Sequence, residues 1–180
     1  PGDTLLDAPC GTGRHAELFA ARGIRVTGID LNPVLIRMAK AHAAKTKPRY
    51  EVGNLLNLKK CEGRFDAVVN LFTSFGYFST EKENEAVMRG LVAALKPGGR
   101  IAFNLIDRDW LLKHFRANCS TEKNGIFTLE ARRYDVKTRM IEAQIVRLNQ
   151  KSGQGRVFYH RTRLYSKTEM VRLMKAAGLR

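Results

Sequence analysis

The stretch Leu5-Leu6-Asp7-Ala8-Pro9-Cys10-Gly11-Thr12-Gly13-Arg14-His15-Ala16 decides the fold of this chain. Apolar residues at its start predict a short buried strand over 3–7, and the residues after its two glycines predict a helix over 14–22. A Gly-x-Gly-x-x-Ala turn therefore joins a strand to a helix, which is the local context expected of a ligand-binding glycine turn.

Strand and helix signals continue to alternate through the first 106 residues. Strands are predicted at 3–7, 24–29, 50–53, 65–71 and 100–106, and helices at 14–22, 33–45 and 81–95. The tetrapeptide Lys96-Pro97-Gly98-Gly99 is typical of a turn that precedes the fifth strand. The alternation predicts an α/β fold, a doubly wound and mostly parallel sheet with helices on both faces.

The pattern changes after residue 106. The sequence predicts a short helix at 109–115, antiparallel strands at 127–134, 140–148 and 157–165, and a last helix at 167–177 that Ser166 caps and Gly178 ends. We therefore expect an α/β core at 1–106 that binds a cofactor, an insertion of one helix and antiparallel strands at 107–165, and a C-terminal helix of the core at 166–180.

Composition limits the class of protein. The chain has 180 residues, 44% of them hydrophobic, which suits a globular domain with its own core. The sequence contains no apolar run of about 18 residues and no secretory leader, so we expect a cytoplasmic protein without a membrane span. The three cysteines, Cys10, Cys61 and Cys119, lack CxxC spacing, so we expect neither a disulfide framework nor a metal site.

The chain is strongly basic, with a net charge of +15 at pH 7 and a pI near 10.2. Such a charge would suit a polyanionic partner such as RNA, because clustered Lys and Arg release condensed counterions on binding. The basic residues are instead scattered along the chain, without a long tract and without interleaved aromatic residues that would stack on bases. A nucleic-acid partner is therefore not favoured.

Asp7 distinguishes between ligands for the glycine turn, because it is expected beside Gly11 and Gly13 at the end of the first strand. A fixed carboxylate there would repel the pyrophosphate of NAD or FAD by roughly 4 kcal/mol at about 4 Å and an effective dielectric near 20. S-adenosylmethionine carries an ammonium group and a sulfonium but no phosphate, so the same carboxylate favours it. A simpler alternative, a carboxylate that caps the turn through backbone N–H groups, is compatible with this interpretation. Asp30, about twenty residues further on, is expected to accept hydrogen bonds from both ribose hydroxyls.

Together these motifs resemble those of class I methyltransferases, the Rossmann-like family that uses S-adenosylmethionine. The resemblance covers about residues 3–106 and also includes the run Leu95-Lys96-Pro97-Gly98-Gly99-Arg100. Asn54 stands where the family often has an acid that receives the adenine amino group; the alternative is an ordinary turn asparagine. The implied cofactor-binding residues are Asp7, Gly11 and Gly13 at the methionine half, Asp30 at the ribose, Leu31, Asn54 and Leu55 at the adenine, and also Ala8 and Asn70.

The segment Asn70-Leu71-Phe72-Thr73-Ser74-Phe75-Gly76-Tyr77-Phe78 follows the fourth strand, at the carboxyl edge where open α/β sheets bind ligands. It lacks the Asn/Asp-Pro-Pro-aromatic motif of enzymes that methylate nucleobase amines and the Pro-Cys nucleophile of RNA cytosine C5 enzymes. It resembles a small-molecule subgroup that includes N-methyltransferases of nucleotide-linked aminosugars, as does the segment 164–179. The resemblance implies that Phe72, Ser74, Phe75 and Tyr77 contact the substrate; for Phe75 and Tyr77 the alternative is packing beneath the loop.

Methyl transfer from a sulfonium is an in-line displacement, in which well-oriented reactants gain roughly 7 to 11 kcal/mol. A neutral amine attacks without a base, whereas a protonated amine or a hydroxyl must first lose a proton. The candidates for that proton transfer are Tyr77, His160 and Tyr165, each with a structural role as the alternative. The insertion is expected to supply substrate contacts or the surface of a homodimer.

The sequence therefore predicts an S-adenosylmethionine-dependent methyltransferase that acts on a nitrogen or oxygen of a small-molecule substrate. An RNA-directed methyltransferase and a non-catalytic cofactor-binding module are the alternatives. The chain begins almost at its first strand and ends at Leu179-Arg180, where the resembled family continues into a sixth and a seventh strand. We therefore expect a fragment whose C-terminal strands are missing.

Overall fold

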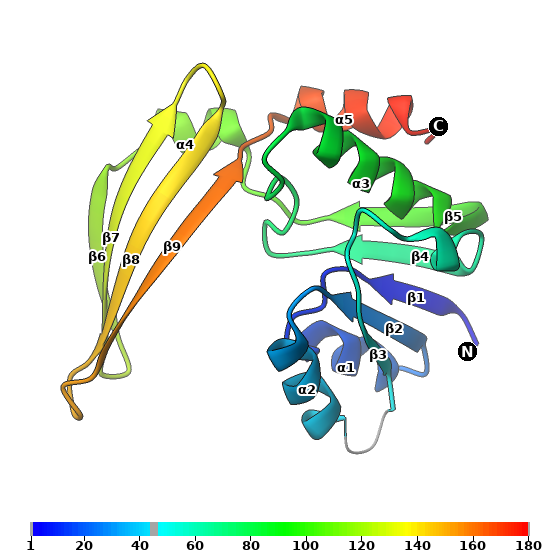
Figure 1. Cartoon of the computed structure of the whole chain (residues 1–180), viewed down its shortest axis with the longest axis horizontal. Coiled ribbons are helices and arrows are strands. Elements are labelled where there is room, and N and C mark those ends of the chain that lie inside the picture. The colour runs from blue at the N-terminus through cyan, green and yellow to red at the C-terminus, as the bar shows by residue number, and fades with distance from the viewer. Residues whose placement is uncertain (1, 44–46, 180) are drawn as a thin grey trace. The chain divides into compact units, whose positions relative to one another are not determined.

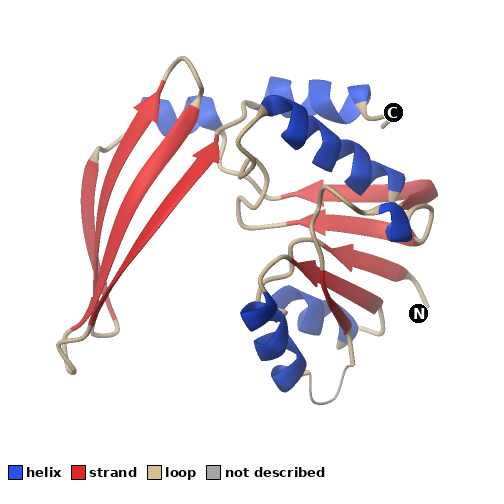
Figure 2. Cartoon of the chain, viewed as in Figure 1, coloured by secondary structure: helices blue, strands red, loops and turns tan. Residues whose placement is uncertain are grey.

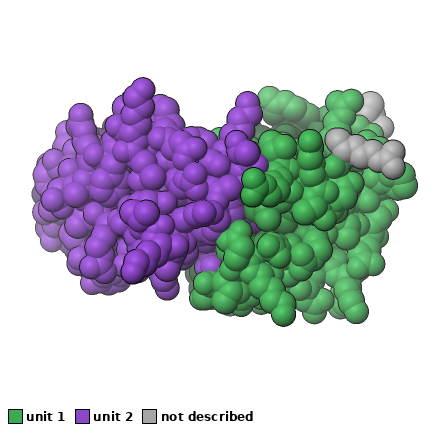
Figure 3. Space-filling view, turned by 90° about the horizontal axis from the view of Figure 1, so that it is seen from above, with its two compact units in different colours: residues 1–74, 79–105, 171–180 green, residues 75–78, 106–170 purple. Residues whose placement is uncertain are grey.

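The computed structural model describes residues 2–43 and 47–179. The chain divides into two compact units, which are coloured separately in Figure 3. Unit 1 comprises residues 1–74, 79–105 and 171–180, and unit 2 comprises residues 75–78 and 106–170. Nothing in the part of the chain that the structure describes is a helix long and apolar enough to span a membrane.

Unit 1 contains a five-stranded sheet in which all neighbouring strands are parallel, in the order β3-β2-β1-β4-β5 (Figure 1). Its strands are β1 (Thr4–Asp7), β2 (Arg25–Asp30), β3 (Arg49–Val52), β4 (Phe65–Asn70) and β5 (Leu95–Phe103). Its helices are α1 (Arg14–Ala20), α2 (Pro33–His42), the short 3-10 helix η1 (Lys59–Cys61) and α3 (Glu81–Ala93). The predicted α/β fold is confirmed, although the end predicted for the second helix, near residue 45, lies outside the described residues.

The strand order places a topological switch point between β1 and β4. From β1 the chain continues to β2 and β3 on one side, and then returns to β4 and β5 on the other. On one face of the sheet, Leu5 and Val69 pack with Ala16 of α1 and Ile36 of α2. Because ligands of open α/β sheets bind beyond the carboxyl ends of the strands at such a point, the residues that end β1 and β4 are of functional interest.

The fifth strand differs from its prediction. β5 begins at Leu95, pairing with Phe65, and its pairing with β4 resumes at Arg100 opposite Ala67. Lys96 to Gly99 therefore form an irregularity within the strand, with Gly98 at φ +76°, and the predicted turn before the strand was wrong. The Lys-Pro-Gly-Gly sequence favours a turn, but β5 pairs with β4 on both sides of it, and a bulge accommodates the extra residues. The strand also ends at Phe103, before the predicted residue 106.

Unit 2 is built around a four-stranded antiparallel sheet in the order β6-β7-β8-β9 (Figure 2). Its elements are α4 (Arg108–Lys113), β6 (Asn118–Lys123), β7 (Ile126–Asp135), β8 (Met140–Asn149) and β9 (Gly155–Arg163). The prediction missed β6, because this mostly exposed edge strand carries almost no apolar residues. Leu111 of α4 packs with Ile141 and Leu164 to form a small core.

The segment 75–78 belongs to unit 2 although it follows β4 in sequence. The Arg163 N–H donates to the Gly76 carbonyl at 2.8 Å. Gly76 has φ +99°, and a Cβ at this position would collide with the backbone carbonyl of Arg163. A glycine is therefore required for this loop to lie against the end of β9.

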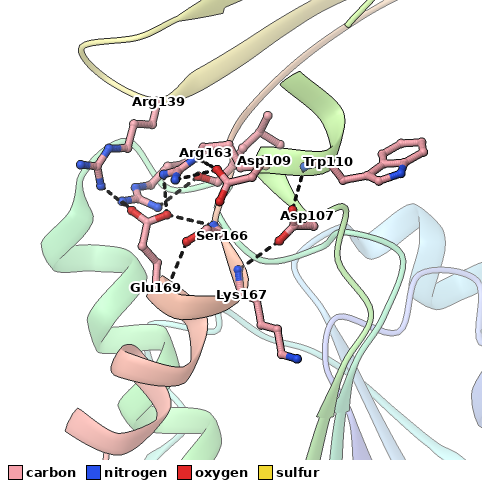
Figure 4. Close-up of polar contacts among 10 residues, drawn as sticks. Asp107, Asp109, Trp110, Arg139, Arg163, Ser166, Lys167 and Glu169 are labelled. Carbon is pink, nitrogen blue, oxygen red and sulfur yellow. Dashed lines mark hydrogen bonds and ion pairs between the residues drawn. The ribbon is translucent and has the colours of Figure 1, made fainter. Parts of the chain in front are cut away.

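Helix α5 (Lys167–Ala176) begins with a capping box, which confirms the predicted Ser166 cap. The Glu169 N–H donates to Ser166 Oγ at 3.2 Å, and the Ser166 N–H donates to Glu169 Oε2 at 2.9 Å. The guanidinium groups of Arg139 and Arg163 also converge on the Glu169 carboxylate (Figure 4), and the Arg108 guanidinium pairs with the same carboxylate at 2.6 Å. Four donors thus share one carboxylate at the point where β9 leads into α5.

Candidate functional site

Asp7 lies at the carboxyl end of β1 and is only 2% exposed. Burial raises the pKa of its carboxyl to about 7; the charge of Asp30 adds to the rise, and a hydrogen bond from the Ala16 N–H opposes it. The bond to Ala16 means that the carboxyl is directed at the first turn of α1, directly after the glycine turn. A buried acid with this pKa is poised to bind a cationic group, because a nearby positive charge would favour its ionised form.

Two buried oxygens at the switch point have no hydrogen-bond partner among the described residues. They are Asp7 Oδ2 at the end of β1 and Asn70 Oδ1 at the end of β4. The amide of Asn70 is held in place by its Nδ2, which donates to the Ala8 carbonyl at 2.8 Å. Unsatisfied buried acceptors are costly, so this arrangement suits a ligand that brings several N–H donors, as an ammonium group does.

The glycine turn has the backbone geometry that its sequence predicts. Gly11 has φ +55° with open space where a Cβ would lie, and Gly13 has φ +80° immediately before α1. The Gly11 N–H donates to Asp30 Oδ2 at 2.9 Å, and the Asn32 N–H donates to Asp30 Oδ1 at 2.9 Å. Asp30 therefore closes the turn from the end of β2 and retains lone pairs on both oxygens for a ligand.

Tyr50 on β3 supports the glycine turn, and the sequence did not single it out. Its hydroxyl donates to Glu17 Oε1 at 2.8 Å and lies 3.3 Å from the Gly13 carbonyl oxygen. A Cβ on Gly13 would collide with the Tyr50 ring, and a Cβ on Gly28 would lie 2.7 Å from it. Both glycines are thus needed for close packing around one aromatic side chain. The sequence shows only that Tyr50 lies in a predicted strand, and its contacts with the glycines appear only in the fold.

The residues assigned to the adenine differ in exposure. Leu31, directly after Asp30, is 63% exposed and available to a flat ligand, whereas Leu55 is buried. Asn54 Oδ1 accepts the Leu56 N–H at 3.0 Å, so the amide oxygen expected at the adenine already belongs to a local turn. An additional lone pair of that oxygen remains, and the adenine role of Asn54 stays a prediction.

The chain that follows β4 is held in an unusual backbone conformation. Phe72 and Thr73 have φ of +57° and +54°, values that non-glycine residues rarely adopt. Both are held by Asn104, whose Oδ1 accepts the Phe72 N–H at 3.2 Å and whose carbonyl accepts the Thr73 N–H at 2.8 Å. The Ser74 hydroxyl donates to the Leu71 carbonyl at 2.6 Å, so its proton is used within the loop.

Among the residues of unit 2, Phe75 and Tyr165 form a buried pair. Their ring centroids are 5.1 Å apart, and the Arg163 guanidinium lies 3.8 Å from the centroid of the Tyr165 ring. Phe75 is 2% and Tyr165 3% exposed. This burial agrees with the packing alternative for both residues, and a substrate or proton-transfer role for either stays a prediction.

Tyr77 and His160 lie together in unit 2, with ring centroids 5.6 Å apart. Burial raises the pKa of the Tyr77 hydroxyl. Burial also lowers the pKa of His160; the charge of Glu130 opposes this effect and that of Arg132 adds to it. The imidazole is therefore neutral at pH 7 and able to accept a proton, so two of the three proton-transfer candidates are neighbours.

Comparison with known proteins identifies the family of this chain. A profile described as "Methyltransferase domain" matches residues 5–99, a stretch that makes up just over half of the chain and contains the glycine turn, Asp30 and Asn70. The chain belongs to the methyltransferase domain family. Family membership agrees with the resemblance drawn from the motifs of the sequence.

Relatives of this methyltransferase domain are known from sequence and from structure. The chain is 29% identical over 114 residues to a ubiquinone biosynthesis O-methyltransferase of Idiomarina loihiensis, an alignment that covers 62% of this chain and 46% of the relative. The chain thus spans less than half the length of such curated relatives.

The fold is shared with solved methyltransferases. An S-adenosylmethionine-dependent methyltransferase from Clostridium acetobutylicum matches with a TM-score of 0.85 at 17% identity, covering 98% of this chain and 72% of that one. CalS10, an amino pentose methyltransferase from Micromonospora echinaspora solved with S-adenosylmethionine bound, matches with a TM-score of 0.73 at 24% identity, covering 98% and 75%. The TM-scores establish a common fold, and at identities this low they establish the fold alone.

Proposed function

We propose that this chain is an S-adenosylmethionine-dependent methyltransferase that methylates a nitrogen or oxygen nucleophile of a small-molecule substrate by in-line displacement. The observation that carries the proposal is the buried Asp7 carboxyl at the glycine turn, with one oxygen that no described residue satisfies. A dinucleotide would bring a pyrophosphate to this position, whereas S-adenosylmethionine brings a cation. Membership of the methyltransferase domain family supports the same conclusion.

The residues of unit 1 fit the cofactor. Asp7 and Asn70 would hold its ammonium group, with Ala8, Gly11 and Gly13 shaping the backbone around its methionine half. Asp30 would hold the ribose, and Leu31, Asn54 and Leu55 would surround the adenine. When bound, S-adenosylmethionine supplies an electrophilic methyl group on a sulfonium.

We propose that the acceptor is contacted by residues that follow β4. Phe72 and Ser74, with Phe75 and Tyr77, are the proposed substrate contacts. His160 is neutral at pH 7 and would take the proton from an ammonium or hydroxyl acceptor, with Tyr77 and Tyr165 as further candidates for that role. The proposed division is a cofactor-binding core at 1–106, an acceptor-binding insertion at 107–165, and a C-terminal segment at 166–180 whose helix α5 would belong to the core.

We further propose a cytoplasmic homodimer formed through the insertion. Leu129, Val146 and Val157 lie in register across β7, β8 and β9, on a face that also carries Leu148 and Tyr159. Leu129, Val157 and Tyr159 on this face are exposed. An apolar sheet face of this kind is stabilised when a second copy covers it.

The proposed function is tested by two measurements on the same preparation. Calorimetry should detect binding of S-adenosylhomocysteine, and a panel of small amines and hydroxyl compounds should yield S-adenosylhomocysteine from S-adenosylmethionine with at least one acceptor. Binding without turnover across a broad panel would favour a non-catalytic module. RNA binding with a steep salt dependence would favour an RNA-directed enzyme. Absence of S-adenosylhomocysteine binding would refute the proposal.

A further inference from the structure

Arg14 is the first residue of α1 and is exposed. Its guanidinium carbon lies 4.6 Å from the centroid of the Phe72 ring, and residues 2–43 and 47–179 provide no carboxylate that pairs with it. Stacking on an aromatic ring occupies a face of the guanidinium and leaves the N–H groups along its edge free to donate. Arg14 is thus a cation held by an aromatic surface without an anionic partner in this part of the protein.

The aromatic surface is itself held in place at some cost. Phe72 is 62% exposed, yet its backbone and that of Thr73 are kept in the left-handed region by two hydrogen bonds to Asn104. Non-glycine residues are strained in this region and persist where the surroundings require them, often at ligand sites. The Phe72 ring also lies 5.0 Å from the His15 ring, so three side chains form one cluster beside the glycine turn.

The charges near this turn are of opposite sign. Burial and the neighbouring Arg14 lower the pKa of His15, so Arg14 supplies the positive charge of the cluster at pH 7. Asp7 supplies a negative charge when it is ionised, and it is bonded to the N–H of Ala16, two residues after Arg14 on the first turn of α1. An α-amino acid group carries an ammonium and a carboxylate on one carbon, and it therefore matches an acid that is bonded to the first turn of α1 and a guanidinium that this turn carries. A planar guanidinium edge is also the preferred partner of a carboxylate.

We propose that Arg14, held on the Phe72 ring, binds the α-carboxylate of the methionine half of the cofactor, while Asp7 binds the ammonium. This assignment rests on the proposed function and adds to it a residue that recognises the acid group of the cofactor. It predicts that the chain distinguishes S-adenosylmethionine from its decarboxylated analogue, which keeps the amine, the sulfonium and the nucleoside.

The test compares these two compounds by calorimetry on the whole chain. Wild type should bind S-adenosylmethionine more tightly than the decarboxylated analogue. Arg14→Gln should weaken binding of S-adenosylmethionine by about tenfold, the low end for a hydrogen bond between charged groups, and leave the analogue unchanged. Phe72→Leu should reduce the same discrimination in part, because it removes the stacking surface.

Two controls separate this effect from others. Arg22→Gln removes an exposed arginine that donates to the Leu18 carbonyl near the other end of α1, and it should change neither affinity. Asp7→Asn should weaken both compounds, since both carry the amine. An Arg14→Gln variant that binds both compounds like wild type, or that loses both equally, would overturn the carboxylate assignment and leave the proposed function standing. Failure of wild type to bind either compound would overturn both.

Discussion

Replacement of Asp7 by Asn should stabilise the protein, and increasingly so as the pH rises. The pKa of the Asp7 carboxyl is raised from 3.8 to about 7 in the folded chain. Between these values the folded state holds a proton that the unfolded state has released, so the stability of the wild type falls as pH rises through this interval. Asn has the shape of the protonated acid and does not ionise, so the variant escapes this loss.

The size of the effect follows from the two pKa values. Since each pKa unit is worth about 1.36 kcal/mol, the gain in unfolding free energy is about 1.5 kcal/mol at pH 5 and about 4 kcal/mol at pH 8. Any effect of the introduced side-chain amide that does not depend on pH is the same at pH 5 and pH 8, so it cancels when the two values are subtracted. The difference, about 2.5 kcal/mol between pH 5 and pH 8, is therefore the quantity to measure.

Urea unfolding of wild type and Asp7→Asn at pH 5, 6, 7 and 8 provides the assay. Asp66→Asn is a matched control: the pKa of Asp66 is held below its ordinary value by the hydrogen bond from the Lys96 ammonium. Because Asp66 is ionised in both states throughout this range, the effect of its replacement should not change with pH. A stability difference for Asp7→Asn that is equally flat would refute the reasoning about its burial.

Three further predictions concern Asp7, the packing of the glycine turn on Tyr50, and the ion pairs of Glu169. The affinity for S-adenosylhomocysteine should fall below about pH 7, by up to about tenfold per pH unit, because the ligand ammonium requires the ionised form of Asp7; calorimetry over a pH series would expose a flat profile as the contrary result. Gly13→Ala should destabilise the chain by more than about 1 kcal/mol because its Cβ collides with Tyr50, whereas Gly11→Ala meets open space and should cost only the left-handed conformation, about 1 kcal/mol; equal effects in thermal unfolding would contradict this packing. Glu169→Gln should lower the unfolding free energy by about 3 kcal/mol, since it leaves three guanidinium groups without their shared charge; a loss below about 1 kcal/mol in urea unfolding would mean that solvent replaces the carboxylate.

Much of the fold could be predicted because its signals are local. The central strands β1 and β4 are short, largely apolar segments with buried carboxyl ends, the pattern expected of a buried parallel strand. The Ser166 cap was likewise predictable, because a capping box lies within four residues of sequence. In contrast, β6 is an edge strand of polar residues, and its pairing with β7 is visible only once β7 itself is in place.

The candidate site was predictable where the residues that shape the backbone and the residue that carries the charge lie in one short motif. Asp7 and the two glycines of the turn follow from one contiguous motif. Tyr50 was missed because its role depends on contacts with Gly13 and Gly28, which the sequence separates from it by more than twenty residues. The left-handed backbone of Phe72 was missed because non-glycine residues rarely adopt it; in the structure, Asn104 holds it by accepting hydrogen bonds from the Phe72 and Thr73 N–H groups.

The contact between Gly76 and Arg163 has a consequence for the exchange of segments between members of this family. A loop that follows β4 and the last strand of the insertion are parts of one body, although over eighty residues separate them in sequence. Grafting the insertion of another methyltransferase onto this core would leave the loop without its matching strand. Exchange of the insertion between relatives therefore requires both segments to be transplanted together, with a glycine retained where they meet.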